Sequence, residues 1–506
     1  MRPRPSILVA AALLAGCGST RDDLAGWTAQ DAAPAVPAGA EDAEAKDTVP
    51  GEAGAGPLRR ELTIAEAVTE AIAHNRTVQQ ARLNVAIGID DTQEARAALI
   101  PNLFFTGSYS AVDQPRSINS TGGSIPVAPE DTWAMAVSLD FPIFAFGRHL
   151  NTWRAAQLAQ HGAESTQRAV EADTAAAVTA AAFDVLETIQ AIDVARSNEE
   201  ALAQQVRDAQ AQLDAGSVTK VAVLEASVEH DAAKRIREKL ESLVPIRKMT
   251  LNKLLGRPAS GAIEVEDAPD LRAPIWQLEP LVEEALDTRP EIRAARLNVA
   301  SAERTLRASI GQELGELRGS VTWDTDDNPF RAPSDQLNFL LTLNVPVFTG
   351  GARTARIRRA RHQLESTMIV VRDLEADVRT EVAQSYRAAV EAFRDIGVAR
   401  SAVERQEESV RIQREKFKNG RATSREVLDS VALLRNARFE LVNATYSYNV
   451  ALRELVRARG LDPRKDPFSE IRQGVAAAPG TLEGELEEAI RRAAPEGEGA
   501  AGAVPK

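Results

Sequence analysis

The chain has 506 residues, of which 44% are hydrophobic and only 4% aromatic, and its formal net charge is −13. The acidic balance argues against nucleic acid as a partner. Five scattered histidines and one cysteine exclude a zinc cluster, a disulfide framework and a Cys/His nucleophile pair. We therefore predict neither an enzyme nor a cofactor-binding protein.

The N-terminus has the features of a secretory signal. Arg2 and Arg4 precede an apolar run at 7–14, which is too short to remain as a membrane span. The small residues directly before Cys17 resemble a bacterial lipobox. We expect residues 1–16 to be removed and Cys17 to carry a covalent lipid. The alternative is an ordinary signal peptide with a chance cysteine.

Two segments have no apolar periodicity. Residues 17–57 are rich in Ala, Pro, Gly and Glu, and residues 463–506 have a similar composition. The first is predicted to be a lipid-anchored flexible tether and the second a mostly disordered tail.

The region between these tails repeats itself. The sequence ARLNVA at 81–86 recurs at 295–300, and VSLDFPIF at 137–144 recurs as LTLNVPVF 204 positions later. The first offset is 214, and the offset from residue 137 onward stays at 204, as for Gly216 and Gly420 and for Gly256 and Gly460. Chance similarity does not hold an offset of 204 over more than a hundred residues, so the sequence predicts a duplication, with repeats at 58–260 and 261–462.

Each repeat is predicted to contain a helical segment, two strands, a long helix and a shorter helix. The predicted helical ranges are 63–98, 148–214, 218–255, 280–310, 352–419 and 422–459. Apolar or alanine positions in the long helices step by four and three, which indicates coiled-coil packing. A helix of roughly 67 residues is about 100 Å long. This length favours extended antiparallel hairpins over a globular core, with Gly216 and Gly420 ending the long helices at the far turns.

Four runs alternate with period two, at 102–112, 132–141, 317–324 and 337–345. Their length suits tilted strands that cross a bilayer, with one face toward lipid and the other toward water. The predicted lipid-facing residues are Phe105, Tyr109, Trp133, Val137, Leu139, Phe141, Trp323, Phe339, Leu341 and Leu343. A soluble sandwich is the alternative explanation of the alternation.

Four strands are too few to close a barrel, and an open sheet edge cannot face lipid. Several copies must therefore share one barrel. Eight strands fill their interior with side chains, so three or more copies are preferred for a conduit. Pro142 and Pro346 follow the alternating runs and donate no hydrogen bond, so we expect the strand ladders to stop there, at joints between barrel and tunnel.

Residues 60–460 resemble a TolC-type outer-membrane factor, of a lipoprotein subtype. The resemblance rests on the strand pairs, on DFPIF at 140–144 and NVPVF at 344–348 with the glycines after them, and on KFKNGRATSREVLD at 416–429. It implies a mainly helical homotrimer with a 12-stranded β-barrel in the outer membrane, continued by an α-helical barrel in the periplasm. It also implies a periplasmic adaptor and an inner-membrane transporter of the RND, ABC or MFS type as partners. The implied function is the passive export of drugs, metal ions or proteins.

The resemblance also implies two sites. An acidic periplasmic gate corresponds to Glu426 and Asp429, with Glu225 as the weaker equivalent in the first repeat. The alternative is a solvated helix face on which Arg425 and Asp429 form a weak ion pair. The turns implied to dock the adaptor contain Gly216, Ser217, Val218, Gly420, Arg421 and Ala422. The alternative is that the glycine turns have a structural role only.

A periplasmic adaptor lipoprotein is the rival hypothesis, because it too combines a lipobox with a helical hairpin. It predicts one hairpin flanked by compact β domains and no lipid-facing strands.

Overall fold

The computed structural model describes residues 61–113, 117–120, 123–126, 131–266, 269–274, 276–326 and 336–461. The expected signal peptide, Cys17, the tether and the tail at 463–506 lie outside these residues.

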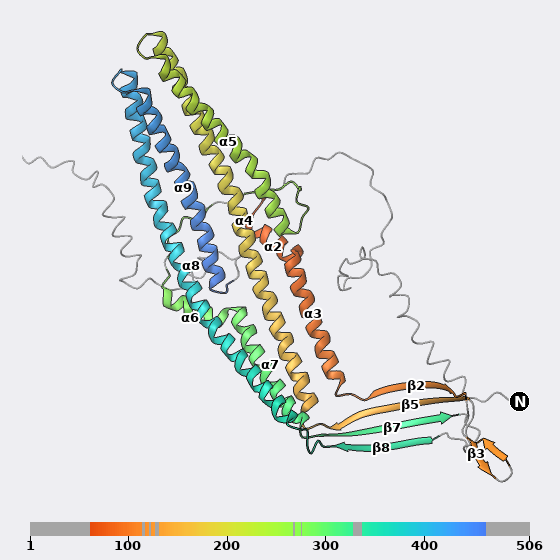
Figure 1. Cartoon of the computed structure of the whole chain (residues 1–506). Coiled ribbons are helices and arrows are strands. Elements are labelled where there is room, and N and C mark those ends of the chain that lie inside the picture. The colour runs from red at the N-terminus through yellow and green to blue at the C-terminus, as the bar shows by residue number, and fades with distance from the viewer. Residues whose placement is uncertain are drawn as a thin grey trace, which may run out of the picture. The chain divides into compact units, whose positions relative to one another are not determined.

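Two long helical hairpins dominate the described chain (Figure 1). They consist of α4 (Arg148–Asp214) with α5 (Lys220–Leu255), and α8 (Ala352–Lys418) with α9 (Ser424–Ala458). In addition, α4 contacts α9 across the two repeats. The residues buried in α4 are mostly small or β-branched, as at Ala175, Val178 and Ala182, which lets the helices approach closely. The predicted duplicated hairpins are therefore confirmed.

Among the described helices, α4 alone is long and apolar enough to cross a membrane by composition. Half of that apolar window is buried inside the protein, however, as in the core helix of a soluble assembly. The packing of α4 against α5 and α9 accounts for its apolar character.

The first helical segment predicted in each repeat is in fact two helices. We call the region where these helices meet the junction. The helices are α2 (Ile64–His74) and α3 (Arg76–Ala97) in the first repeat, and α6 (Leu278–Thr288) and α7 (Pro290–Gln312) in the second. Asn75 separates the first pair because its extended backbone ends α2 while its side chain caps α3. Pro290 takes the first position of α7, where its missing N–H costs nothing.

The junction contains the main hydrophobic clusters. α2 packs against α4 and α5, and α6 packs against α8, through residues such as Val68, Val185, Leu281 and Val378. Two short parallel strands that the sequence did not predict, β1 (Glu61–Leu62) and β6 (Glu264–Val265), pair there as well.

The four predicted strands form one antiparallel sheet in the order β2-β5-β7-β8. Their bounds are Asn102–Ala111 for β2, Asp131–Phe144 for β5, Glu316–Asp326 for β7 and Gln336–Asn344 for β8. The longer first loop contains an additional hairpin, β3 (Ser117–Ser120) with β4 (Gly123–Pro126). Strands β2 and β8 leave the sheet open at both edges.

The expectation that Pro142 ends its ladder is wrong, because β5 continues to Phe144 with a β-bulge between Pro142 and Phe144. Strand β2 begins at Asn102, opposite Asp140, so β5 beyond Asp140 is paired only with β7. A proline is tolerated on such a one-sided or bulged stretch. Pro346 does lie beyond the end of its strand, β8.

An ion-pair network joins the repeats at the junction. Arg289 is buried, with 3% of its surface exposed, and its Nη1 lies 2.5 Å from a carboxylate oxygen of Glu381. Arg457 also contacts Glu381 and lies 2.9 Å from Asp173 of α4. Burial raises the pKa of Glu381, but the two arginines outweigh this effect and hold the pKa below its ordinary value.

We predict that Glu381→Gln lowers the free energy of unfolding by about 2 kcal/mol at neutral pH, because it leaves the buried Arg289 without its counter-charge. A carboxyl with a lowered pKa stabilises the fold above its unfolded pKa of about 4.3, and this stabilisation is lost as the pH falls through the folded pKa. Melting temperatures from circular dichroism should therefore differ most near neutral pH and converge on acidification.

Glu365→Gln is the matched control, since Glu365 lies on the same helix but its side chain is 73% exposed. A difference in melting temperature between wild type and Glu381→Gln that stays constant with pH would contradict the assignment of this network.

Candidate functional site

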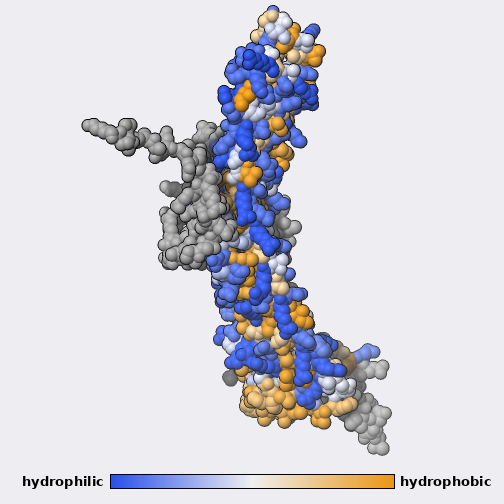
Figure 2. Space-filling view, turned by 90° about the vertical axis from the view of Figure 1, so that its left-hand side faces the viewer, coloured by the Kyte–Doolittle hydropathy of each residue, from blue (hydrophilic) through white to orange (hydrophobic). Residues whose placement is uncertain are grey.

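The strand register places all ten predicted lipid-facing residues on one face of the sheet. Phe105 lies opposite Val137, and Val137 lies opposite Trp323. Tyr109 and Trp133 are likewise paired, with ring centroids 4.7 Å apart. Most of this face is exposed in the single chain, up to 75% for Phe339. Figure 2 shows hydrophobic side chains gathered at the end of the molecule that carries the sheet.

The opposite face of the sheet is mainly polar. One cross-strand row of this face contains Asn102, Asp140, Ser320 and the apolar Leu340, and the next row contains Ser138, Thr322, Asn338 and the apolar Phe104. A sheet with one apolar and one mainly polar face can separate hydrocarbon from water.

The loop after β8 exposes apolar side chains that the sequence analysis did not single out. Val347 and Phe348 are 94% and 88% exposed, and Phe144 packs edge-on against Phe146 at the equivalent place in the first repeat. The repeated proline sequence indicated this location, but only the structure shows that Val347 and Phe348 are left almost fully exposed within the described chain.

The two far turns have the same backbone design. Gly216 and Gly420 adopt left-handed φ angles of 72° and 68°. In each turn the N–H after the glycine bonds to a carbonyl five residues earlier, as from Ser217 to Gln212, which satisfies the end of the long helix. A side chain without this freedom would strain either glycine position.

Side chains also hold the two far turns together. Gln212 Nε2 donates a hydrogen bond to the carbonyl of Phe417, 3.2 Å away. Phe417, Leu202 and Val427 belong to a cluster with contributions from all four hairpin helices. A hollow of about 570 Å³ lies between the turns. Its lining includes the predicted docking residues Ser217, Val218, Gly420 and Ala422.

The predicted gate carboxylates Glu426 and Asp429 are exposed on one side of α9, and each has a local partner. Glu426 completes a capping box with Thr423, in which its carboxylate accepts from the Thr423 N–H at 2.7 Å. Asp429 lies 3.7 Å from Arg425, with both side chains about two-thirds exposed. Such an exposed pair is weak, so it does not hold the Asp429 carboxylate away from solvent or from an ion.

The first repeat differs at the equivalent positions. Ala222 takes the place of Glu426, and the N-cap residue Thr219 makes no side-chain cap hydrogen bond. Glu225 is half-buried and lines the hollow between the turns. Residues of the second far turn, Arg425 among them, line the same hollow.

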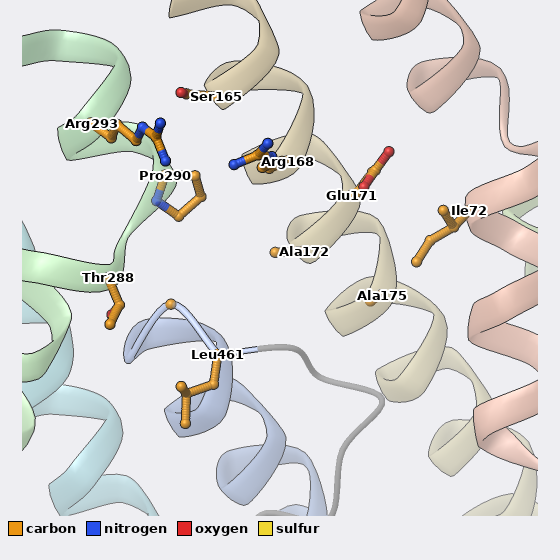
Figure 3. Close-up of a pocket in the computed structure, with 11 residues that line it drawn as sticks. Ile72, Ser165, Arg168, Glu171, Ala172, Ala175, Thr288, Pro290, Arg293 and Leu461 are labelled. Atoms are coloured by element: carbon orange, nitrogen blue, oxygen red, sulfur yellow. The ribbon is translucent and has the colours of Figure 1, made fainter. Parts of the chain in front are cut away.

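A second hollow, of about 300 Å³, lies at the junction, where no sequence pattern predicted one (Figure 3). Its lining comes from α2, α4, α6, α7 and the end of the described chain, and includes Arg168, Glu171, Arg293 and Leu461. Within the described residues, no group of three His, Cys, Asp or Glu side chains could hold a metal ion.

Comparison with known proteins matches this architecture. The sequence profile described as outer membrane efflux protein matches residues 67–257 and 281–461, well over half of the chain. The two matched ranges follow the duplication. The break between them falls where β6 and the loop before α6 separate the repeats.

The chain is similar to the outer membrane efflux protein BepC of Brucella suis, with 25% identity over 79% of this chain and 85% of the relative. It is 23% identical to the outer membrane protein TolC of Escherichia coli, over 70% of this chain and 73% of that one. Its fold matches the crystal structure of CusC, with a TM-score of 0.71 and 18% identity over 79% and 92% of the two chains. The chain therefore belongs to the outer membrane efflux protein family and is a TolC-type outer-membrane channel.

Proposed function

We propose that three copies of this chain form the exit duct of a tripartite efflux pump or type I secretion system, through which substrates pass without energy input from the duct itself. The observation that carries this proposal is the four-stranded sheet, which is apolar on one face, polar on the other and open at both edges. A single copy of such a sheet cannot remain in hydrocarbon, because its edge N–H and C=O groups would have no partners.

Closure requires β8 of one copy to pair with β2 of the next. Two copies would give eight strands, whose interior is filled by side chains, whereas three give twelve and leave room for a passage. The helices that join the sheet support the same closure. Within one chain α3 contacts α4, α4 contacts α7 and α7 contacts α8, so these four helices form one layer that three copies would close into a tunnel (Figure 1).

The rival adaptor hypothesis fits the structure poorly. The chain has two long hairpins where an adaptor predicts one, and its long strands form an open sheet with an exposed apolar face. Membership of the channel family agrees with this reading.

We assign the docking of a periplasmic adaptor to the far turns, and that adaptor would bridge to an RND, ABC or MFS transporter. Ser217 and Arg421 are exposed at the tips of the hairpins, beside the hollow that separates the two turns. Rigid turns with exposed polar side chains on a packed cluster suit recognition by a partner helix hairpin.

A covalent lipid on Cys17 would add an anchor to a chain that its strands already hold in the membrane. We predict that Cys17→Ser removes the lipid, seen as a loss of the acyl mass by mass spectrometry. The assembled channel should still fractionate with the outer membrane, because the barrel buries far more apolar surface than the acyl chains. Loss of the variant to the soluble periplasm would contradict a spanning barrel.

Carboxylates from three copies would form rings at Glu426 and Asp429 in the narrow end of the tunnel. We predict that the wild type conducts in planar bilayers with a preference for cations, and that Glu426→Gln with Asp429→Asn reduces this preference and weakens block by multivalent cations. Glutamine keeps the acceptor that the capping box needs, so the turn should stay folded.

Glu225→Gln serves as a graded control for the gate, because this half-buried residue is the first-repeat equivalent of Asp429, whereas Ala222 takes the place of Glu426. It should produce a smaller change in cation preference. Unchanged selectivity of the double variant in a folded trimer would refute the gate.

Docking at the far turns can be tested by photo-crosslinking in cells. A photoreactive residue at Ser217 should label a periplasmic adaptor that mass spectrometry identifies, whereas the same residue at Arg405 should not. Arg405 is also exposed, but it lies about four turns before the end of α8. Equal labelling from both positions would remove the far turns as the specific docking site.

A further inference from the structure

We propose that neighbouring copies of this chain recognise one another through a charged seam between α8 of one copy and α3 of the next. In this seam Arg358 and Arg359 of α8 face Asp90 and Glu94 of α3, and an apolar contact continues it toward the junction. The inference rests on the proposed trimer and names the surface that closes it.

The two helices occupy the free flanks of the chain. Helix α3 leads directly into the edge strand β2, and α8 follows the opposite edge strand β8. Within one copy α3 packs mainly on α4, and this part of α8 packs on α7 (Figure 1). If β8 pairs with β2 of the next copy, α8 must come to lie beside the next copy's α3.

The basic residues of α8 point away from α7. Glu375 marks the side of α8 that faces α7, because it accepts a hydrogen bond from Arg296 at 3.0 Å. At 100° per residue, Arg359 lies about 160° and Arg358 about 100° around the helix from Glu375. The outer side of α8 therefore carries this arginine pair.

The acidic residues of α3 point away from α4 in the same manner. Gly88 marks the α4 side, because a Cβ there would lie 3.4 Å from Gln160 Cα. Asp90 lies about 160° and Glu94 about 120° around α3 from Gly88. Two outward surfaces of opposite charge thus occupy the two flanks that must meet.

The charged residues of α3 and α8 also lie at the same distance from the sheet. Asp90 lies seven residues before Ala97, the end of α3, and Arg359 lies seven residues after Ala352, the start of α8. Each is therefore about 10 Å from the sheet end of its helix. Because the helices run in opposite directions, this spacing brings the two charges level.

An apolar match follows further from the sheet. Leu83 and Ile87 of α3 are 55% and 56% exposed, and Ile369 and Val370 of α8 are 52% and 57% exposed. Leu83 lies 14 residues from the sheet end of α3, and Ile369 lies 17 residues from that of α8. The difference is less than one helical turn, so the two exposed apolar pairs fall within reach of each other.

The charges lack partners within one copy. Among the described residues, neither Arg358 and Arg359 nor Asp90 and Glu94 forms an ion pair, whereas the nearby Arg356 contacts Glu313. Neighbouring like charges repel, and cations near the N-terminus of α8 oppose its dipole. An anionic lipid surface would satisfy the arginines alone. A second copy of the chain also accounts for the acids and for the apolar match, so we favour it.

Charge reversal tests the seam in the full-length channel purified in detergent, with mass measured by light scattering. Arg358→Glu with Arg359→Glu should abolish the trimer, and so should Asp90→Arg with Glu94→Arg. Combining all four substitutions should restore it, since opposite charges face each other again. The matched control is Arg353→Glu with Arg361→Glu, because both arginines lie about 40° from Glu375, on the α7 side. This control should leave the trimer intact.

Cross-linking tests the same contact while Glu94 and Arg358 keep their charges. In a Cys17→Ser background, which has no other thiol, Asp90→Cys with Arg359→Cys should yield dimers and trimers with a short bismaleimide cross-linker. Asp90→Cys with Arg353→Cys should not.

Three results would overturn the seam: a trimer that survives either reversal, singly reversed pairs that the combination fails to rescue, or a folded trimer without the Asp90–Arg359 cross-link. Loss of binding to phosphatidylglycerol vesicles in an otherwise intact Arg358→Glu, Arg359→Glu trimer would instead assign the arginines to lipid. A wild-type protein that is not a trimer would contradict the proposed function, and not the seam alone.

Discussion

The structure depends on one constraint: backbone N–H and C=O groups cannot remain unpaired in hydrocarbon. The sheet of this chain is apolar on one face, yet β2 and β8 leave rows of such groups open at its edges. One copy therefore cannot complete its own membrane domain. Edge pairing between copies satisfies these groups, and it also decides which helices become neighbours, because α3 and α8 continue directly from the two edge strands.

Beyond the sheet, the duplication sets the geometry. Each repeat contributes one strand pair and one helical hairpin, and α4 and α8 each run for 67 residues. The long helices pass the junction unbroken, while the shorter helices stop on either side of it. The junction carries the buried ion pairs around Glu381 and most of the buried apolar side chains. The junction therefore packs the short helices α2 and α6 against the long helices of both repeats.

Charged residues perform different tasks at different levels of the channel. At the junction they are buried and mutually paired, so they contribute to stability. At the far turns Glu426 and Asp429 stay exposed, with only local partners. Near the sheet, Arg358 and Arg359 of α8 and Asp90 and Glu94 of α3 have no ion-pair partner among the described residues of the same copy. Charges that hold one chain together are therefore separate from those that we propose act between chains or on a passing ion.

Local sequence periodicity determined most of the secondary structure, because a hydrophobic period of two or of 3.5 can be recognised from neighbouring residues without knowledge of a distant partner. The four strands, the long hairpins and the glycine turns at Gly216 and Gly420 were predictable for this reason. The bulge at Pro142, the hollow at the junction and the pairing of Glu381 with Arg289 and Arg457 were not. Each depends on residues far apart in the chain, and only the tertiary structure decides which of them meet.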